Sequence, residues 1–333
     1  MTSSTDFEAP RFADIESAAR RLEGTAVVTP LLESPLLNER LGGRLLIKAE
    51  PLQRTGSFKF RGAYNRISRL GDSELERGVV AFSSGNHAQG VAAAAHAMGA
   101  SATIVMPADV PAVKLDNTRA WGAEVVTYDR YREDRDVVAG DLAEKLGATL
   151  VPPYDHPLII AGQGTVGLEI AWQAEAAGAE LDAVLSPCGG GGLISGCALA
   201  LAERAPGAEV YAVEPEGFDD TARSLAEGRR QDSVEGAKSF CDALLAKTPG
   251  ELTFSINRRL LAGGLVVSDG EVAHAMATAL NYFKLVAEPG GATALAAVLS
   301  GKYDCRGKTV AVIVSGGNVD PVVFAEALTR PSP

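Results

Sequence analysis

Short apolar segments alternate with longer, alanine-rich amphipathic segments along most of this chain, and this alternation limits the folds open to it. The apolar segments predict strands at 78–83, 102–106, 124–128, 149–153, 181–187, 208–215 and 308–316. The amphipathic segments predict helices at 86–99, 111–122, 133–147, 163–178, 193–207 and 319–328. Strand-then-helix repetition is typical of parallel sheets covered by helices on both faces, so we predict an α/β fold.

Composition narrows the classes of function. The 333 residues suffice for two lobes, and the net charge of -11 argues against nucleic acid as a partner. Every apolar run is too short for a membrane span, and the first ten residues lack the features of a signal peptide. The four cysteines form no C-x-x-C pair, which favours a reduced, cytoplasmic protein. The four histidines lack metal-ligand spacing.

Three predicted strands end in turns of small residues, "SSGNHAQG" (83–90), "CGGGGLISG" (188–196) and "SGGNVD" (315–320). Such turns lie at the carboxyl ends of the strands, where α/β sheets bind ligands. The four consecutive glycines Gly189, Gly190, Gly191 and Gly192 expose backbone N–H groups before a helix, which suits a phosphate. The pattern is neither G-x-G-x-x-G nor a P-loop, so it indicates a phosphate without indicating a dinucleotide or a nucleoside triphosphate.

Lys59 lies between Phe58 and Phe60 in "RTGSFKFRGA". The residues alone leave two interpretations open, a salt bridge or a partly desolvated amine that acts as a nucleophile. A phosphate cradle together with a desolvated lysine favours pyridoxal phosphate, which carries one phosphate and an aldehyde that forms a Schiff base with a lysine.

Five motifs resemble a known family. "TGSFKFRGA", "SSGNHAQGVA", "GQGTVGLEI", "GGGGLISG" and "VSGGN" occur in the order found in the serine/threonine dehydratases and serine racemases. These are two-lobed, fold-type II pyridoxal-phosphate enzymes related in fold to the tryptophan synthase β subunit. The resemblance extends from about Thr29 to Val322, which is nearly the whole chain.

The resemblance implies roles around the cofactor. Lys59 is the Schiff-base lysine and the base that abstracts the α-proton. The other implied cofactor contacts are Phe58 beside the ring, Asn86 at the 3′-oxygen, Gly189 to Gly192 at the phosphate, Glu288 near the ring and Ser315 at the pyridine nitrogen. A neutral serine hydroxyl makes a weaker electron sink than a carboxylate partner, and this suits loss of a β-leaving group.

The resemblance also implies a substrate site. Ser83, Ser84, Asn86 and His87 resemble the loop that receives the substrate carboxylate. Ser84 is the expected proton donor on the face opposite Lys59, with a helix N-cap as its alternative. Arg135 lies where some relatives place an arginine near the substrate, with a solvated helix arginine as its alternative.

The stretch "VEPEGFDD" resembles a divalent-cation site. In the family pattern, carboxylates corresponding to Glu214 and Asp220 bind Mg²⁺, Mn²⁺ or Ca²⁺ together with a backbone carbonyl, here expected from Phe218. The alternative is that these acids cap the helix that follows.

These observations lead to one prediction. The protein eliminates water from L-threonine or L-serine, with a large domain (1–52 and 154–333) that binds pyridoxal phosphate and a small mobile domain (53–153). The alternatives are a serine racemase, a 3-hydroxyaspartate dehydratase, or a non-catalytic amino-acid sensor on the same scaffold. The expected partners are a small amino-acid substrate and a second copy of the chain in a homodimer.

Overall fold

Two sheets of mainly parallel strands form the frame of the protein, as the sequence predicts. The computed structural model describes residues 7–83, 85–110, 112–129 and 131–330. The larger sheet has the order β1 (Leu31–Glu33), β2 (Arg44–Ala49), β10 (Thr309–Val314), β7 (Ala183–Pro187), β8 (Glu209–Pro215) and β9 (Gly263–Val267). Its neighbouring strands are parallel except for β1 and β2. The smaller sheet is parallel, in the order β5 (Glu124–Tyr128), β4 (Ala102–Pro107), β3 (Val79–Phe82) and β6 (Thr149–Leu150).

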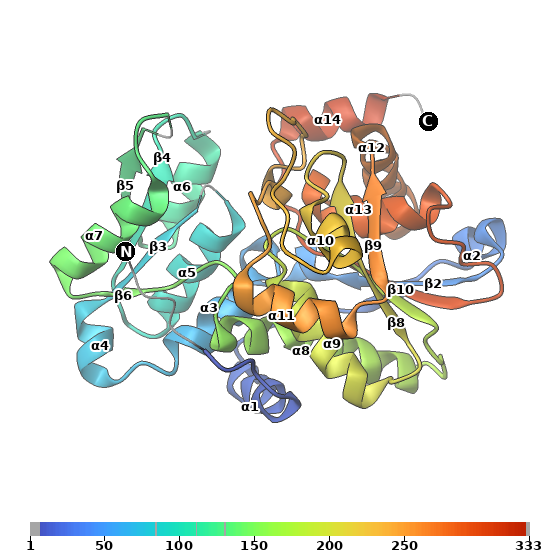
Figure 1. The fold of residues 1–333 in the computed structure, drawn as a ribbon, viewed down its shortest axis with the longest axis horizontal. Helices are drawn as coiled ribbons and strands as arrows, with labels where there is room; N and C mark the ends of the chain where they lie inside the picture. Colours follow the sequence, from blue (N-terminus) through green and yellow to red (C-terminus); the bar gives the residue numbers. More distant parts are fainter. Residues whose placement is uncertain (1–6, 84, 111, 130, 331–333) are drawn as a thin grey trace.

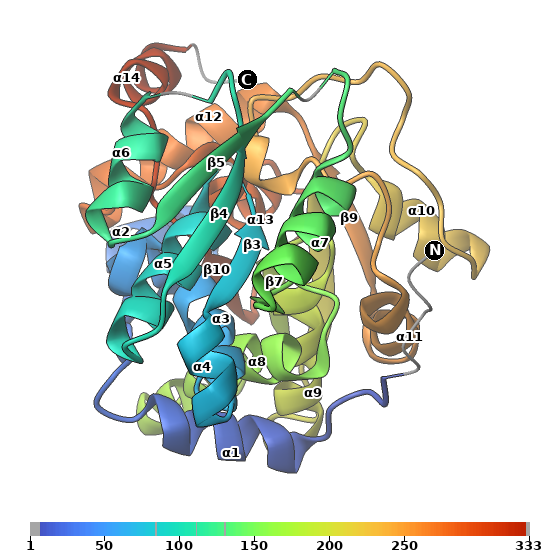
Figure 2. The same cartoon turned by 90° about the vertical axis from the view of Figure 1, so that its left-hand side faces the viewer.

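Helices cover both faces of the smaller sheet. Its helices are α4 (Asp72–Arg77), α5 (Asn86–Ala97), α6 (Ala112–Ala120) and α7 (Arg135–Leu146). Val79 and Ala81 pack with the alanines of α5, whereas Val80 and Phe82 pack with α7. All of β3 is therefore buried, which is why its sequence is continuously apolar. Figure 2 shows α5 and α6 on one side of these strands and α7 on the other.

The remaining helices lie around the larger sheet or between the two sheets (Figure 1). They are α1 (Phe12–Leu22), α2 (Pro35–Leu41), α3 (Lys59–Ile67), α8 (Pro157–Ala176), α9 (Gly192–Arg204), α10 (Asp220–Glu227), α11 (Glu251–Leu260), α12 (Asp269–Thr278), α13 (Pro289–Leu299) and α14 (Pro321–Thr329). Short 3₁₀ turns lie at η1 (Glu50–Leu52), η2 (Arg54–Gly56) and η3 (Asp242–Leu244), and a π-helical turn η4 (Ala279–Phe283) follows α12. In the described ranges no helix is both long and apolar enough to cross a membrane.

Helices α3, α8 and α9 cross with their backbones almost in contact. A Cβ atom at Gly162 would lie 2.6 Å from the carbonyl oxygen of Arg61, and one at Gly164 would lie 2.7 Å from that of Gly196. Both distances are too short for a side chain, so the glycines of "GQGTVG" permit this close crossing. The crossing fixes α3, the helix that begins at Lys59, against α8.

Candidate active site

A cavity of about 180 Å³ lies at the carboxyl ends of β3, β7 and β10, where the motifs place the ligand. It is lined by most of the residues predicted for the cofactor and the substrate. These are Phe58, Lys59, Ser83, Asn86, His87, Arg135, Gly189, Gly190, Gly191, Gly192, Glu288 and Ser315. Ser84 lies outside the described residues. The predicted metal ligands Glu214, Phe218 and Asp220 are not among the residues that line the cavity.

Lys59 presents its amine inside this cavity without a direct carboxylate contact. Its Nζ donates a hydrogen bond to the backbone carbonyl of Pro153 at 2.8 Å and lies 5.2 Å from the centroid of the Phe58 ring. Burial lowers the pKa of the amine from its ordinary 10.5 to about 8, and the charge of Glu288 opposes only part of this shift. The neutral amine is thus accessible near neutral pH, which favours a nucleophile over a salt bridge.

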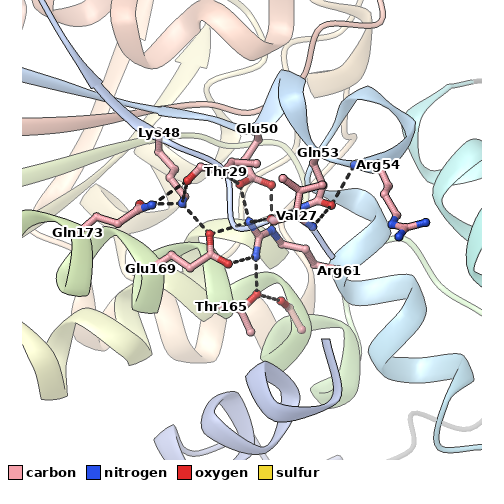
Figure 3. Close-up of polar contacts among 11 residues, drawn as sticks. Val27, Thr29, Lys48, Glu50, Gln53, Arg54, Arg61, Thr165, Glu169 and Gln173 are labelled. Carbon is pink, nitrogen blue, oxygen red and sulfur yellow. Dashed lines mark hydrogen bonds and ion pairs between the residues drawn. The ribbon is translucent and has the colours of Figure 1, made fainter. Parts of the chain in front are cut away.

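Arg61, two residues after Lys59, holds the start of α3 in place (Figure 3). Its side chain is only 1% exposed and lies between two carboxylates. Glu50 accepts hydrogen bonds from Nε and Nη2, at 2.9 and 2.8 Å. Glu169 of α8 accepts from Nη1 and Nη2, at 2.6 and 2.8 Å. These two forked contacts tie α3 to α8 and to the end of β2.

A second buried cation completes this cluster. The Nζ of Lys48 donates to Glu169 at 2.6 Å, to the carbonyl of Thr29 at 2.6 Å and to Gln173 at 2.8 Å. We call Lys48, Glu50, Arg61 and Glu169 the charge cluster, because two cations face two anions in it (Figure 3). Loss of one member would leave an uncompensated buried charge, which typically costs about 3–5 kcal/mol.

Asn318 connects the turn before Lys59 to the start of α5. Its Nδ2 donates to the carbonyl of Thr55 at 2.6 Å and to Oδ1 of Asn86 at 2.8 Å. Thr55 has a φ of 61°, which is rare for a β-branched residue. Asn86 donates in turn to Glu288 at 2.5 Å. Burial, followed by the charge of Asp242, raises the pKa of Glu288 to about 8.

His87 is held as a neutral imidazole. Its Nε2 lies 2.9 Å from the carbonyl oxygen of Val151, which identifies Nε2 as the protonated nitrogen, because a carbonyl only accepts hydrogen bonds. Burial lowers the pKa of His87 to about 3, and the charge of Lys59 adds to this effect. The other nitrogen, Nδ1, is buried without a hydrogen-bond partner. His87 therefore offers the cavity an acceptor and not a positive charge.

The four-glycine turn leads directly into α9. A Cβ atom at Gly190 would lie 2.4 Å from the Tyr154 ring, and Gly191 has a φ of 93°, so both positions require glycine. No side chain of the residues that the structure describes caps α9, whose first backbone N–H groups lack intrahelical partners. This arrangement suits an anion at the start of the helix.

Arg135 and Ser315 lie at different depths of the cavity. Arg135 begins α7 and is half exposed, with Nε 3.5 Å from Asp136 and its guanidinium 5.4 Å from the centroid of the Phe82 ring. Ser315 is buried at the end of β10. Its backbone carbonyl accepts a hydrogen bond from the N–H of Phe58 at 3.2 Å, which joins the end of β10 to the residue before Lys59.

Comparison with known proteins identifies the family. Residues 22–316 match the family described as "Pyridoxal-phosphate dependent enzyme". The chain belongs to this family. It is 42% identical to L-threo-3-hydroxyaspartate ammonia-lyase of Saccharomyces cerevisiae (96% of this chain and 97% of the yeast protein) and 45% identical to the enzyme of the same name from Pseudomonas sp (95% and 98%). The crystal structure of a threonine deaminase from T.th. is 45% identical and superposes with a TM-score of 0.88, covering 93% of this chain and 99% of that one.

The residues present fit the family's cofactor. The cavity contains an amine that is readily neutral, an uncapped helix N-terminus for a phosphate, and Ser315, whose hydroxyl is suited to a ring nitrogen. The intact Lys59 argues against the alternative of a non-catalytic amino-acid sensor on the same scaffold. The chain is a fold-type II pyridoxal-phosphate enzyme.

The predicted cation site is not confirmed. Among the described residues no group of three or more His, Cys, Asp or Glu side chains could hold a metal. Glu214 is fully buried and accepts hydrogen bonds from the backbone N–H groups of Thr221 and Ala222, at 2.9 and 2.8 Å. It therefore caps the start of α10, which is the alternative that the sequence left open.

Several residues of the cavity were not predicted. Tyr154 and Gln163 lie beside the four-glycine turn, and Lys114 forms an ion pair with Asp242 at the wall of the cavity. Gln163 belongs to the motif "GQGTVGLEI", so the signal was present in the sequence. The motif alone does not show which face of α8 carries Gln163. That depends on how α8 packs against α3 and α9.

Proposed function

We propose that this enzyme removes water from a β-hydroxy amino acid and releases a 2-oxo acid and ammonia, with L-threo-3-hydroxyaspartate as the preferred substrate. The observation that carries the proposal is the Lys59 amine, which burial brings to a pKa of about 8 inside a cavity with an anion site at one end. Such an amine is neutral in a useful fraction at neutral pH and can take the α-proton of the substrate.

The residues of the cavity have separate roles in this reaction. When bound, the cofactor supplies an electron sink for the charge that forms at Cα. Lys59 removes the α-proton, and the N-terminus of α5, with Ser83 and Asn86, holds the substrate carboxylate. His87, being neutral, adds an acceptor without adding charge. The β-hydroxyl then leaves as water with one proton taken up, which balances the α-proton removed, and hydrolysis of the unsaturated product yields the 2-oxo acid and ammonia.

Arg135 supports a substrate with a second carboxylate. Arg135 is the arginine among the described residues that line the cavity. Its exposed position lets the guanidinium turn from Asp136 toward a ligand. A forked arginine–carboxylate contact is a strong, directional interaction. The two 3-hydroxyaspartate ammonia-lyases that the chain resembles act on such a substrate by name.

L-Threonine or L-serine is the second candidate, favoured by apolar side chains of the cavity. Phe82, Leu244 and Leu245 line the same cavity and suit a methyl group. In the structure Arg135 covers the Phe82 ring and pairs with Asp136, an arrangement that does not require a ligand carboxylate. Racemisation of serine depends on Ser84 and stays a prediction.

The experiment compares kcat/KM for the two substrates in wild type and Arg135→Gln. If Arg135 binds the side-chain carboxylate, the variant loses about tenfold to hundredfold on 3-hydroxyaspartate and less than about threefold on L-threonine, as expected for a hydrogen bond to a charged group. Arg132→Gln is the control, because Arg132 is an exposed arginine that pairs with Asp129 and does not line the cavity. An equal loss on both substrates would contradict the role of Arg135.

We also propose a divalent cation at Glu214, the carbonyl of Phe218 and Asp220. Its support is Asp220, whose two carboxylate oxygens are buried and have no hydrogen-bond partner within the described part of the chain. A cation that binds only the folded state raises stability by about 2.7 kcal/mol at a hundredfold excess over Kd. The test is the melting temperature with chelator and after addition of Mg²⁺, Mn²⁺ or Ca²⁺. Equal melting temperatures would leave only the helix-capping role of Glu214.

The compartment and the assembly are further proposals. Four free, buried cysteines support a reducing compartment such as the cytoplasm. We propose a homodimer on the strength of the family resemblance alone. Light scattering coupled to size-exclusion chromatography tests it, and a mass of 34.5 kDa in solution would reject it.

A further inference from the structure

Gln163 of α8 is buried at the cavity with its hydrogen-bonding capacity unused. The side chain is only 1% exposed, and among the described residues neither Oε1 nor Nε2 has a hydrogen-bond partner. We propose that Gln163 is a ligand of the cofactor's phosphate group, beside the four-glycine turn. This inference rests on the cofactor of the family and is independent of the choice of substrate.

The position of the amide supports this role. A Cβ atom at Gly192, the first residue of α9, would lie 2.6 Å from Oε1 of Gln163, and one at Gly62 of α3 would lie 3.1 Å from Nε2. Glycine at both positions therefore leaves room for the amide between the starts of α3 and α9. The same start of α9 exposes the N–H groups that suit an anion.

An amide in this place requires a partner from outside the chain. Buried amide groups are almost always hydrogen-bonded, since an unpaired one loses its contacts with water without replacement. The amide places Oε1, an acceptor, nearest Gly192, and a half-turn about its terminal torsion would bring the donor Nε2 there. An amide N–H donates well to a phosphate oxygen, and a donor beside a helix N-terminus adds to the same anion site. The second carboxamide near the turn, Asn257, also has a buried Nδ2 without a partner among the described residues, but its Oδ1 accepts from Ser195 at 2.8 Å and it is not among the residues that line the cavity. The geometry therefore points to Gln163.

A pair of ligands that differ only in the phosphate tests the proposal. Cofactor-free protein is titrated with pyridoxal phosphate and, separately, with pyridoxal, and Kd is measured from the change in absorbance. Gln163→Met keeps the length of the side chain and removes both polar atoms. We expect Kd for pyridoxal phosphate to rise about tenfold to hundredfold, as for a lost hydrogen bond to a charged group, and Kd for pyridoxal to change less than twofold.

The control lies on the same helix. The Gln173 amide accepts from Lys48 and donates to the carbonyl of Thr29 at 2.9 Å, away from the cavity. Gln173→Met should therefore change both Kd values by the same factor or leave both unchanged. A phosphorus NMR spectrum of the bound cofactor adds a direct readout, with a shifted resonance in Gln163→Met and none in Gln173→Met.

A second variant keeps the proposal testable if Gln163→Met folds poorly. Gln163→Glu has nearly the same shape and places a negative charge beside the phosphate, so it should weaken pyridoxal phosphate more than Gln163→Met does and spare pyridoxal. An unchanged Kd for pyridoxal phosphate, or an equal loss for both ligands, would overturn the proposal. These measurements test cofactor binding only. If the enzyme failed to turn over β-hydroxy amino acids, that result would contradict the proposed function and leave the role of Gln163 untouched.

Discussion

The Lys59 amine shows how much a single residue depends on its surroundings. Its place between two aromatic rings is visible in the sequence, which left a salt bridge and a nucleophile as alternatives. The structure adds the Pro153 carbonyl as its partner and the burial that lowers its pKa. The motif could predict the role of Lys59, because forming a Schiff base requires a lysine. Sequence spacing could not reveal the contact with Pro153, which lies 94 residues away.

The lowered pKa predicts how cofactor-free protein takes up pyridoxal phosphate. Only the neutral amine attacks the aldehyde, and its fraction rises with pH until the pKa is passed. We therefore expect the rate of reconstitution, followed by visible absorbance, to level off above about pH 8. An unperturbed lysine would give a rate that still rises toward pH 10.5. Lys59→Ala should show neither the absorbance change nor turnover.

The raised pKa of Glu288 predicts that the folded protein becomes less stable as pH rises. Its pKa is raised from 4.5 to about 8 in the folded state, so the folded protein holds a proton there that the unfolded chain has released. The free energy of unfolding should fall as pH rises between about 4.5 and 8, by at most about 1.4 kcal/mol per pH unit from this group. Urea unfolding of cofactor-free protein measures it. Glu288→Gln should remove this part of the slope, and an unchanged slope would reject the assignment.

At the scale of elements, a buried charge explains why strand β2 was not predicted from the sequence. Apolar runs predict β7, β8 and β10 but not β2, because Lys48 interrupts the apolar pattern of a strand that is nonetheless buried. The carboxylate of Glu169, far along the chain, together with Thr29 and Gln173, makes a lysine acceptable there. The short β9 was missed for another reason, since two of its five residues are glycines.

The crossing of α3 and α8 predicts opposite effects for the same substitution. Gly162→Ala places a Cβ atom 2.6 Å from the carbonyl of Arg61, so we expect it to destabilise the protein by about 1–3 kcal/mol through overpacking. Gly140 lies inside α7 with an ordinary φ, and a Cβ atom there would meet nothing within 4 Å. Gly140→Ala should therefore stabilise the protein by up to about 1 kcal/mol. Thermal or urea unfolding measures both, and effects of equal sign would contradict this account of the crossing.

At the scale of the whole molecule, the boundary between the lobes stays a proposal. The four-stranded sheet occupies 79–150, within the small domain predicted at 53–153. Helix α3 also falls within that range and shares the apolar core of the small sheet through Phe60, Ala63 and Ile67, but the charge cluster and the glycine crossing tie it to α8. Motifs predicted which strands carry the site but not this attachment, because it depends on contacts between residues more than 100 positions apart, such as Arg61 and Glu169. We propose that α3 stays with the large domain when the small domain moves.

Hydrogen exchange tests this division. Backbone amides of α3 should exchange as slowly as those of α8 and β10, whereas amides of α6, which is partly exposed, should exchange faster. Mass spectrometry of cofactor-free protein at several exchange times gives both rates. If α3 exchanged together with α6, the helix would belong to the moving part and the proposed division would be wrong.

The charge cluster also bears on how this scaffold changes its substrate over evolutionary time. Its four members neutralise one another, so a single replacement leaves a buried charge without a partner. A lineage can therefore replace one member only together with a matching change in its partner. Arg135 is different, because it lies half exposed on the first turn of a helix and outside the hydrophobic cores. One replacement there can alter the ligand that the cavity accepts without unfolding the chain. Among related enzymes, substitutions should therefore be more frequent at positions such as Arg135, at the edge of the cavity, than at the four residues of the charge cluster.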